Sequence, residues 1–133
     1  MCSILIVDDE EDVRDAMKMI LERAGHHVQI ASNGAEAIEF QRREPVDLMI
    51  ADIIMPEKDG VSTIKEIRQQ YPGIKIIAIS GGGGVDMSDY KPESIATTAY
   101  LAAAKQAGAD FALTKPFERK ELIKAVDDLF NVH

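Results

Sequence analysis

Four short apolar runs of this sequence end at polar residues that could do chemistry together. They are Asp8 and Asp9 after residues 3–7, Asp52 after residues 48–51, Ser80 after residues 74–79 and Lys115 after residues 111–114. If the three aspartates converge, carboxylates about 4 Å apart repel by about 4 kcal/mol per pair at an effective dielectric constant of about 20. Such a group needs a proton or a cation, and an oxygen-preferring ion such as Mg²⁺ satisfies it.

The aspartates converge if the apolar runs are neighbouring parallel strands. The runs are apolar along most of their length, as strands buried on both faces of a sheet should be. They alternate with segments of helical periodicity, so we predict an α/β fold, a doubly wound five-stranded parallel sheet with five helices. In the flavodoxin-like strand order 2-1-3-4-5, the first and third strands are neighbours, and Asp8, Asp9 and Asp52 meet at one edge of the sheet.

The elements that would position these residues can be placed by their apolar spacing and their end signals. The predicted strands occupy residues 3–7, 27–31, 48–51, 74–79 and 111–114, and the predicted helices lie at about residues 10–24, 35–43, 61–71, 93–107 and 122–130. Gly25 and Gly108 end the first and fourth helices. Residues 10–12 are expected to favour the start of the first helix through their charge, without a role in chemistry.

The composition restricts the class of protein. A chain of 133 residues has the length of one domain, and we predict a single domain over residues 1–133. Without a long apolar run or a secretory signal, the sequence predicts a cytoplasmic protein that does not span a membrane. The formal charge of −8 and the lack of a basic stripe argue against direct binding of nucleic acid. The one cysteine, Cys2, is expected to pack as a small apolar residue.

The order of these residues resembles the receiver domain of bacterial response regulators, the CheY-like domain of two-component signalling. The motifs are Asp8 with Asp9, then Asp52 followed by Met55, Pro56, Asp59 and Gly60, then Ser80, and finally Lys115, Pro116 and Phe117. Each motif alone is weak evidence. Together, in this order and with each chemical group at a predicted strand end, they cover essentially the whole chain.

The resemblance implies that Asp52 accepts a phosphoryl group from a phosphohistidine of a sensor histidine kinase or phosphotransfer protein. It implies a Mg²⁺ ion held by Asp9, Asp52 and the backbone carbonyl of Ile54, with Asp8 acting through a water. It also implies that Lys115 and the hydroxyl of Ser80 bind phosphoryl oxygens. Because a carboxylate is a weak nucleophile, alignment and charge neutralisation must supply most of the catalysis. Such a protein assists its own phosphorylation and dephosphorylation without being an enzyme, and it signals to a target protein by a change of conformation.

Two features depart from the pattern of that family. Receivers usually carry Tyr or Phe three residues before the Lys; here that position is Ala112, and Phe111 is expected on the opposite face of its strand. Residues 81–92 begin with four glycines and make the segment before Lys115 longer than usual. No Gly-Lys-Ser/Thr follows the glycines, so we interpret them as a hinge rather than a nucleotide-binding loop. How phosphorylation would reach a partner is left open by these departures.

Two other functions fit part of the pattern. A Mg²⁺-dependent phosphohydrolase would also use an aspartate nucleophile, but such enzymes typically place a second acid two residues later, where this chain has Ile54. A degenerate receiver that only binds proteins would not need the complete Asp, Ser and Lys set. The chain is expected to act as a stand-alone receiver, although a domain excised from a longer regulator would have the same sequence. The residues do not identify the kinase, the target or the phosphoryl lifetime, and they do not select or exclude a phosphorylation-linked dimer.

Overall fold

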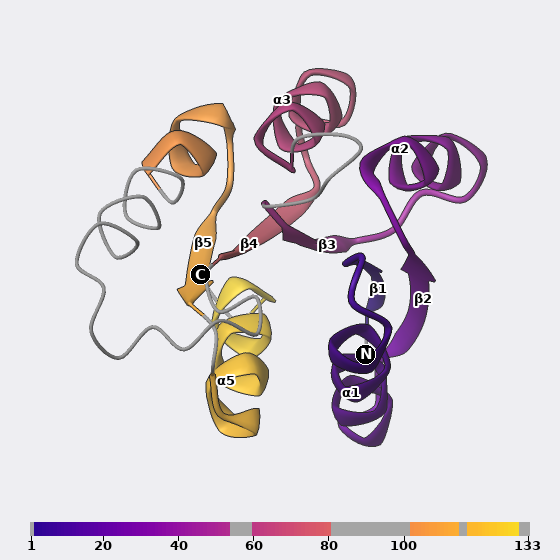
Figure 1. Ribbon diagram of the computed structural model, residues 1–133, viewed down its shortest axis with the longest axis vertical. Helices are drawn as coiled ribbons and strands as arrows, with labels where there is room; N and C mark the ends of the chain where they lie inside the picture. The colour runs from indigo at the N-terminus through magenta and orange to yellow at the C-terminus, as the bar shows by residue number, and fades with distance from the viewer. Residues whose placement is uncertain (1, 54–59, 81–101, 115–116, 131–133) are drawn as a thin grey trace.

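The protein is described by a computed structural model over residues 2–53, 60–80, 102–114 and 117–130. Its strands are β1 (Ser3–Val7), β2 (His27–Ala31), β3 (Leu48–Asp52), β4 (Lys75–Ser80) and β5 (Phe111–Thr114). All pair in parallel, in the order β2-β1-β3-β4-β5 (Figure 1). The predicted α/β fold and its strand order are therefore confirmed.

Helices cover both faces of the sheet (Figure 1). They are α1 (Glu11–Arg23), α2 (Gly34–Arg43), α3 (Gly60–Gln70) and α5 (Arg119–Phe130), together with a helical turn over residues 102–107. The last segment is the end of the predicted fourth helix, and the earlier part of that helix lies outside the described residues. The helices α1 and α5 lie on one face, and α2, α3 and residues 102–107 lie on the other.

The strands are apolar because both of their faces are buried. Leu5, Met49 and Ile76 pack in the core on the α2–α3 side. The neighbouring residues Ile4 and Ile77 pack on the α1–α5 side, because successive strand side chains point to opposite faces. All five residues of β3 are buried, as expected for the central strand of such a sheet.

Local signals in the sequence explain where α2 begins. The Oδ1 atom of Asn33 accepts a hydrogen bond from the Glu36 N–H at 2.9 Å, and the Glu36 carboxylate accepts one from the Ser32 N–H at 2.9 Å. The Asn33 side chain thus caps α2 and satisfies one backbone donor that the helix itself leaves unpaired, while the Glu36 carboxylate binds Ser32, the residue before the N-cap. The hydrogen bonds from the Ser32 N–H and the Ser32 hydroxyl lower the pKa of the Glu36 carboxyl. The Asn33 cap places the first helical residue at Gly34, one residue before the predicted start.

Cys2 packs in the core as predicted. Its side chain lies in the cluster on the α1–α5 side, and it is a free cysteine. Burial, with the nearby Asp47 carboxylate, raises the pKa of the thiol.

Across the described part of the chain, no helix combines the length and the apolar character needed to cross a membrane.

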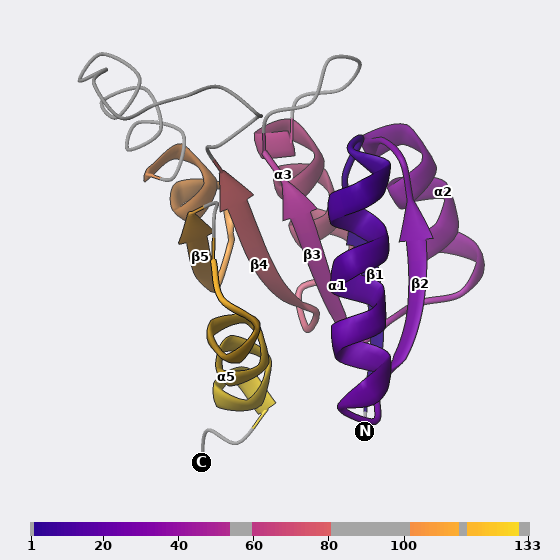
Figure 2. The ribbon, with the colours of Figure 1, turned by 60° about the horizontal axis from the view of Figure 1, so that its bottom comes forward.

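The parallel arrangement brings the carboxyl ends of the strands to one edge of the sheet. Figure 2 shows the arrowheads of β2, β3, β4 and β5 at the same edge, which is also where α1 begins. The polar residues that follow the strands in the sequence are therefore directed to one region of the molecule.

Candidate functional site

Two of the predicted site residues, Asp8 and Asp52, lie at the ends of neighbouring strands. Val7 of β1 pairs with Ala51 of β3, so the residue after each of them stands at the same edge of the sheet. Asp8 is 0% exposed and Asp52 is 5% exposed. The Asp8 N–H donates to the Ala31 carbonyl at 3.2 Å, which ties the end of β1 to β2. The sequence therefore predicted correctly that these two carboxyl groups converge.

A third carboxylate, that of Glu10, joins them. Oxygen atoms of Asp8, Glu10 and Asp52 all lie within 4.8 Å of one another. The Oδ1 atom of Asp8 accepts a hydrogen bond from the Glu10 N–H at 2.9 Å, which holds the turn between β1 and α1. Glu10 is the N-cap residue of α1, in an extended conformation, and its side chain makes no capping hydrogen bond. We call Asp8, Glu10 and Asp52 the acidic cluster.

Sequence reasoning assigned Glu10 only to the start of the helix. No clear signal in the sequence pointed to Glu10, because the chain turns between β1 and α1 and the alternation of side chains along a strand does not continue through a turn. Asp9, between them, is exposed and is not a member of the acidic cluster. Its predicted role as a direct metal ligand stays a prediction.

The other predicted site residues are placed only in part. Ser80 ends β4, the strand next to β3, and pairs with Thr114 of β5. The position of its hydroxyl stays a prediction. Ile54, residues 55–59, residues 81–92 and Lys115 lie outside the described residues.

The electrostatics of the acidic cluster favour a small divalent cation. Two carboxylate charges 4.8 Å apart repel by about 3 kcal/mol at an effective dielectric constant of about 20. Arg14 supplies one nearby positive charge: its side chain is 14% exposed, and its Nη1 donates to the Asp8 carbonyl oxygen at 3.3 Å. Carboxylate oxygens are the ligands that Mg²⁺ prefers, so the residues that are present fit the ion that the sequence predicted.

In β5, the strand beyond β4, the aromatic residue and the alanine lie on the two opposite faces that the sequence predicted. Leu113 packs on the α1–α5 side of the sheet, so Phe111, two residues earlier, faces that side as well. Phe111 is 39% exposed. Ala112 is half-buried on the opposite face and pairs with Ala78, which packs on the α2–α3 side. The expected separation of Phe111 from the usual aromatic position is therefore confirmed.

Comparison with known proteins identifies the family of this fold and site. Residues 4–127 match the sequence model of the response regulator receiver domain. The chain is 36% identical over 129 residues to the chemotaxis protein CheY of Bacillus subtilis, covering 96% of this chain and 97% of that protein. It is 33% identical over 125 residues to the transcriptional regulatory protein GlrR of Escherichia coli, covering 94% of this chain. It spans only 25% of GlrR, about a quarter of its length.

Solved structures agree with the sequence relatives. A CheY-like response regulator receiver domain protein from Methanospirillum hungatei superimposes with a TM-score of 0.82 at 26% identity, covering 97% of this chain and 93% of that one. The receiver domain of NtrX from Brucella abortus gives a TM-score of 0.82 at 27% identity, covering 98% of this chain and 99% of that one. The acidic cluster thus sits on a fold that is shared in full with receiver domains, and the chain belongs to the response regulator receiver domain family.

Proposed function

We propose that Asp52 accepts a phosphoryl group from a phosphohistidine of a sensor histidine kinase or phosphotransfer protein. The observation that carries this proposal is the buried Asp52 at the end of the central strand, with two further carboxylates within 4.8 Å of it. In a receiver domain, that constellation suits a phosphoacceptor beside a cation site. The change of charge and conformation at Asp52 would then alter the binding of a target protein.

The transfer requires only one bond to form and one to break. An oxygen of the Asp52 carboxylate attacks phosphorus, and the bond from phosphorus to the histidine nitrogen breaks. The electron pair stays on that nitrogen, which takes up a proton from solvent. Because Asp52 is held at the end of β3, its backbone is ordered before the donor arrives: the next N–H, of Ile53, donates to the Ile79 carbonyl at 2.9 Å.

The chain's own charged groups would stabilise the transferred phosphoryl group. We propose that Asp9, Asp52 and the Ile54 carbonyl hold Mg²⁺, with Asp8 acting through a water, and the acidic cluster adds Glu10 to these candidates. When bound, Mg²⁺ would neutralise charge on the phosphoryl oxygens. Lys115 and the Ser80 hydroxyl are proposed to interact with the remaining phosphoryl oxygens, as a point charge and a hydrogen-bond donor.

The experiment that tests this proposal is intact-mass measurement after incubation with acetyl phosphate, with and without Mg²⁺. We expect the wild-type protein to gain one phosphoryl group only when Mg²⁺ is present. Asp52→Asn should gain none, because an amide oxygen does not form the acyl phosphate. The matched control is Asp15→Asn on the exposed surface of α1, which should behave as the wild type.

Other outcomes separate the rival functions. Repeated release of phosphate, without a stable gain in mass, would support a phosphohydrolase. No gain from either acetyl phosphate or a phosphorylated histidine donor would support a degenerate receiver that only binds proteins. A gain that persists in Asp52→Asn would show that the acceptor is another residue.

A further inference from the structure

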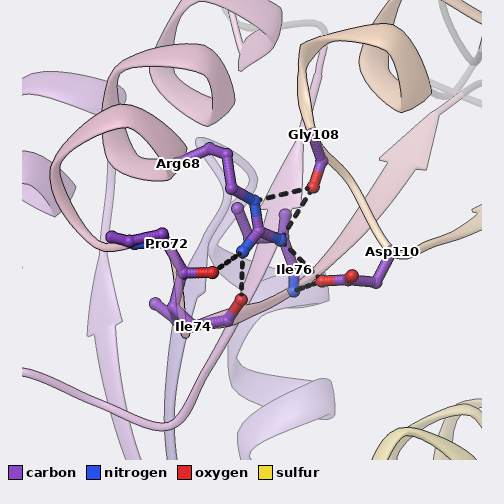
Figure 3. Close-up of polar contacts among 6 residues, drawn as sticks. All are labelled: Arg68, Pro72, Ile74, Ile76, Gly108 and Asp110. Atoms are coloured by element: carbon purple, nitrogen blue, oxygen red, sulfur yellow. Dashed lines mark hydrogen bonds and ion pairs between the residues drawn. The ribbon is translucent and has the colours of Figure 1, made fainter.

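A group of polar contacts at the amino-terminal ends of β4 and β5 centres on Arg68 of α3 (Figure 3). The Nε and Nη2 atoms of Arg68 donate to the Gly108 carbonyl oxygen at 3.1 and 2.8 Å. Its Nη1 donates to the carbonyl oxygens of Pro72 and Ile74 at 2.8 and 2.6 Å. Its Nη2 also pairs with the Asp110 carboxylate at 2.7 Å. We call these five residues the Arg68 clasp.

Asp110 extends the clasp to the sheet. Its Oδ2 accepts a hydrogen bond from the Ile76 N–H at 2.8 Å, and its own N–H donates to the Ile76 carbonyl at 2.8 Å. The residue just before β5 is therefore bound to β4 through both its backbone and its side chain. Arg68 holds that same side chain, and the ionic side chains of Arg68 and Asp110 are 23% and 32% exposed.

Gly108 shows how closely the clasp is packed. Its φ is +129°, and a Cβ atom built on it would lie 2.8 Å from Cγ of Arg68. Its N–H donates to the Ala104 carbonyl at 3.1 Å, so the same residue ends the helical segment before β5. Arg68 thus fixes the point at which the chain leaves that helix and enters the sheet.

The clasp matters for register because β5 has only four residues. Its pairing runs from Phe111 opposite Ile77 to Thr114 opposite Ser80. A shift of one residue would turn every side chain of the strand to the other face. It would also change which residue of β5 pairs with Ser80, and so which residue comes next in the sequence. In the native register Thr114 pairs with Ser80, and Lys115 comes next.

We propose that Arg68 is a positioning residue for phosphoryl transfer: by fixing the start of β5 on β4, it sets the place from which Lys115 reaches the phosphoryl group. The inference rests on the proposed function. Arg68 does not act by contact, because the four residues of β5, about 13 Å of extended chain, lie between Asp110 and Lys115 in the sequence. A displacement of about 1 Å at the reacting groups can still cost about a hundredfold in rate.

The first test measures two quantities on Arg68→Met: the rate of phosphorylation by acetyl phosphate at saturating Mg²⁺, and the Kd for Mg²⁺ from an NMR titration. The rate should fall between about tenfold and about a hundredfold. The Kd should not change, because the acidic cluster comes from β1, β3 and the start of α1. A merely structural residue would not separate these two quantities in this way.

The second test asks whether Arg68 acts through Lys115. In a Lys115→Met background, Arg68→Met should lower the rate no further, because the group that it positions is already gone. An equal fall in both backgrounds would overturn the proposal. So would a wild-type rate in Arg68→Met.

Two further variants keep the test decisive. Asp110→Asn retains an acceptor for the Ile76 N–H and removes the ion pair, so the phosphorylation rate should fall by a smaller factor than in Arg68→Met. This variant carries the test if Arg68→Met does not fold.

Val28→Ala is the control for general destabilisation. It removes buried volume from β2, at the far edge of the sheet, and should keep the wild-type rate. A loss in Val28→Ala as large as in Arg68→Met would assign the effect to general destabilisation and overturn the proposal. Failure of the proposed function would look different, since the wild type itself would then gain no phosphoryl group at Asp52.

Discussion

Glu10 is the residue at which the structure adds most to the sequence. Its carboxylate lies within 4.8 Å of oxygens of Asp8 and Asp52, so its charge acts on any cation held there. We expect Glu10→Gln to weaken Mg²⁺ binding by about tenfold, which corresponds to about 1.4 kcal/mol. The measurement is an NMR titration with Mg²⁺ on the protein without phosphoryl donor.

The control for this prediction is another acid at the start of the same helix. Asp12 is exposed in the first turn of α1, outside the acidic cluster. Asp12→Asn should bind Mg²⁺ as the wild type does, since exposed charges are screened by solvent and salt. If Glu10→Gln and Asp12→Asn give the same affinity, Glu10 is only a helix-start acid and the acidic cluster has two effective members.

At the residue scale, the sequence predicts which strand ends meet but not the direction in which each side chain points. That Asp8 and Asp52 meet follows from apolar runs ending on acids, because parallel strands place their carboxyl ends together. Whether Asp9 or Glu10 turns toward them depends on the backbone after β1. The N-cap conformation of Glu10, with φ −90° and ψ 108°, is not encoded in spacing alone.

At the scale of the elements, Gly108 should tolerate substitution less well than Gly25 or Gly73. Gly108→Ala combines a positive φ of +129° with a Cβ atom 2.8 Å from the Arg68 side chain. We expect it to lower the free energy of unfolding by about 2–4 kcal/mol, from backbone strain and steric conflict together. Urea denaturation followed by circular dichroism measures this change.

Substitutions at Gly25 and Gly73 distinguish the effect of backbone strain from that of steric conflict. Gly25 has a φ of +98° and open space at its Cβ position, so Gly25→Ala should cost only the strain, about 1–2 kcal/mol. Gly73 has neither feature, and Gly73→Ala should change stability by less than about 1 kcal/mol. A loss in Gly73→Ala equal to that in Gly108→Ala would contradict this account.

The elements were the most predictable part of the protein. The bounds of β1, β2 and β5 agree with the sequence-based prediction, because each is a short, mostly apolar segment bounded by turn residues. The start of α2 differs by one residue because Asn33 caps it. The Arg68 clasp could not be predicted, since Arg68 and Asp110 stand 42 residues apart and meet only when β4 and β5 pair.

At the scale of the whole molecule, the acidic cluster should lower the free energy of unfolding when no cation is bound to it. Two buried carboxyl groups and Glu10 stand within 4.8 Å in a chain of net charge −8. Asp8→Asn keeps the side-chain oxygen that accepts from the Glu10 N–H and removes one negative charge. In the absence of divalent cations, we therefore expect its free energy of unfolding to exceed that of the wild type by about 1 kcal/mol or more.

Mg²⁺ should reduce this difference in stability. A ligand that binds only the folded state stabilises it by RT ln(1 + [L]/Kd), about 1.4 kcal/mol at a concentration ten times the Kd. The wild type should gain this amount, whereas Asp8→Asn should gain less because its site has lost a charge. Urea denaturation of both proteins, with and without Mg²⁺, gives the four free energies. If Asp8→Asn is less stable than the wild type without Mg²⁺, the repulsion is already offset within the protein, and the acidic cluster is held together by its own contacts rather than by a cation.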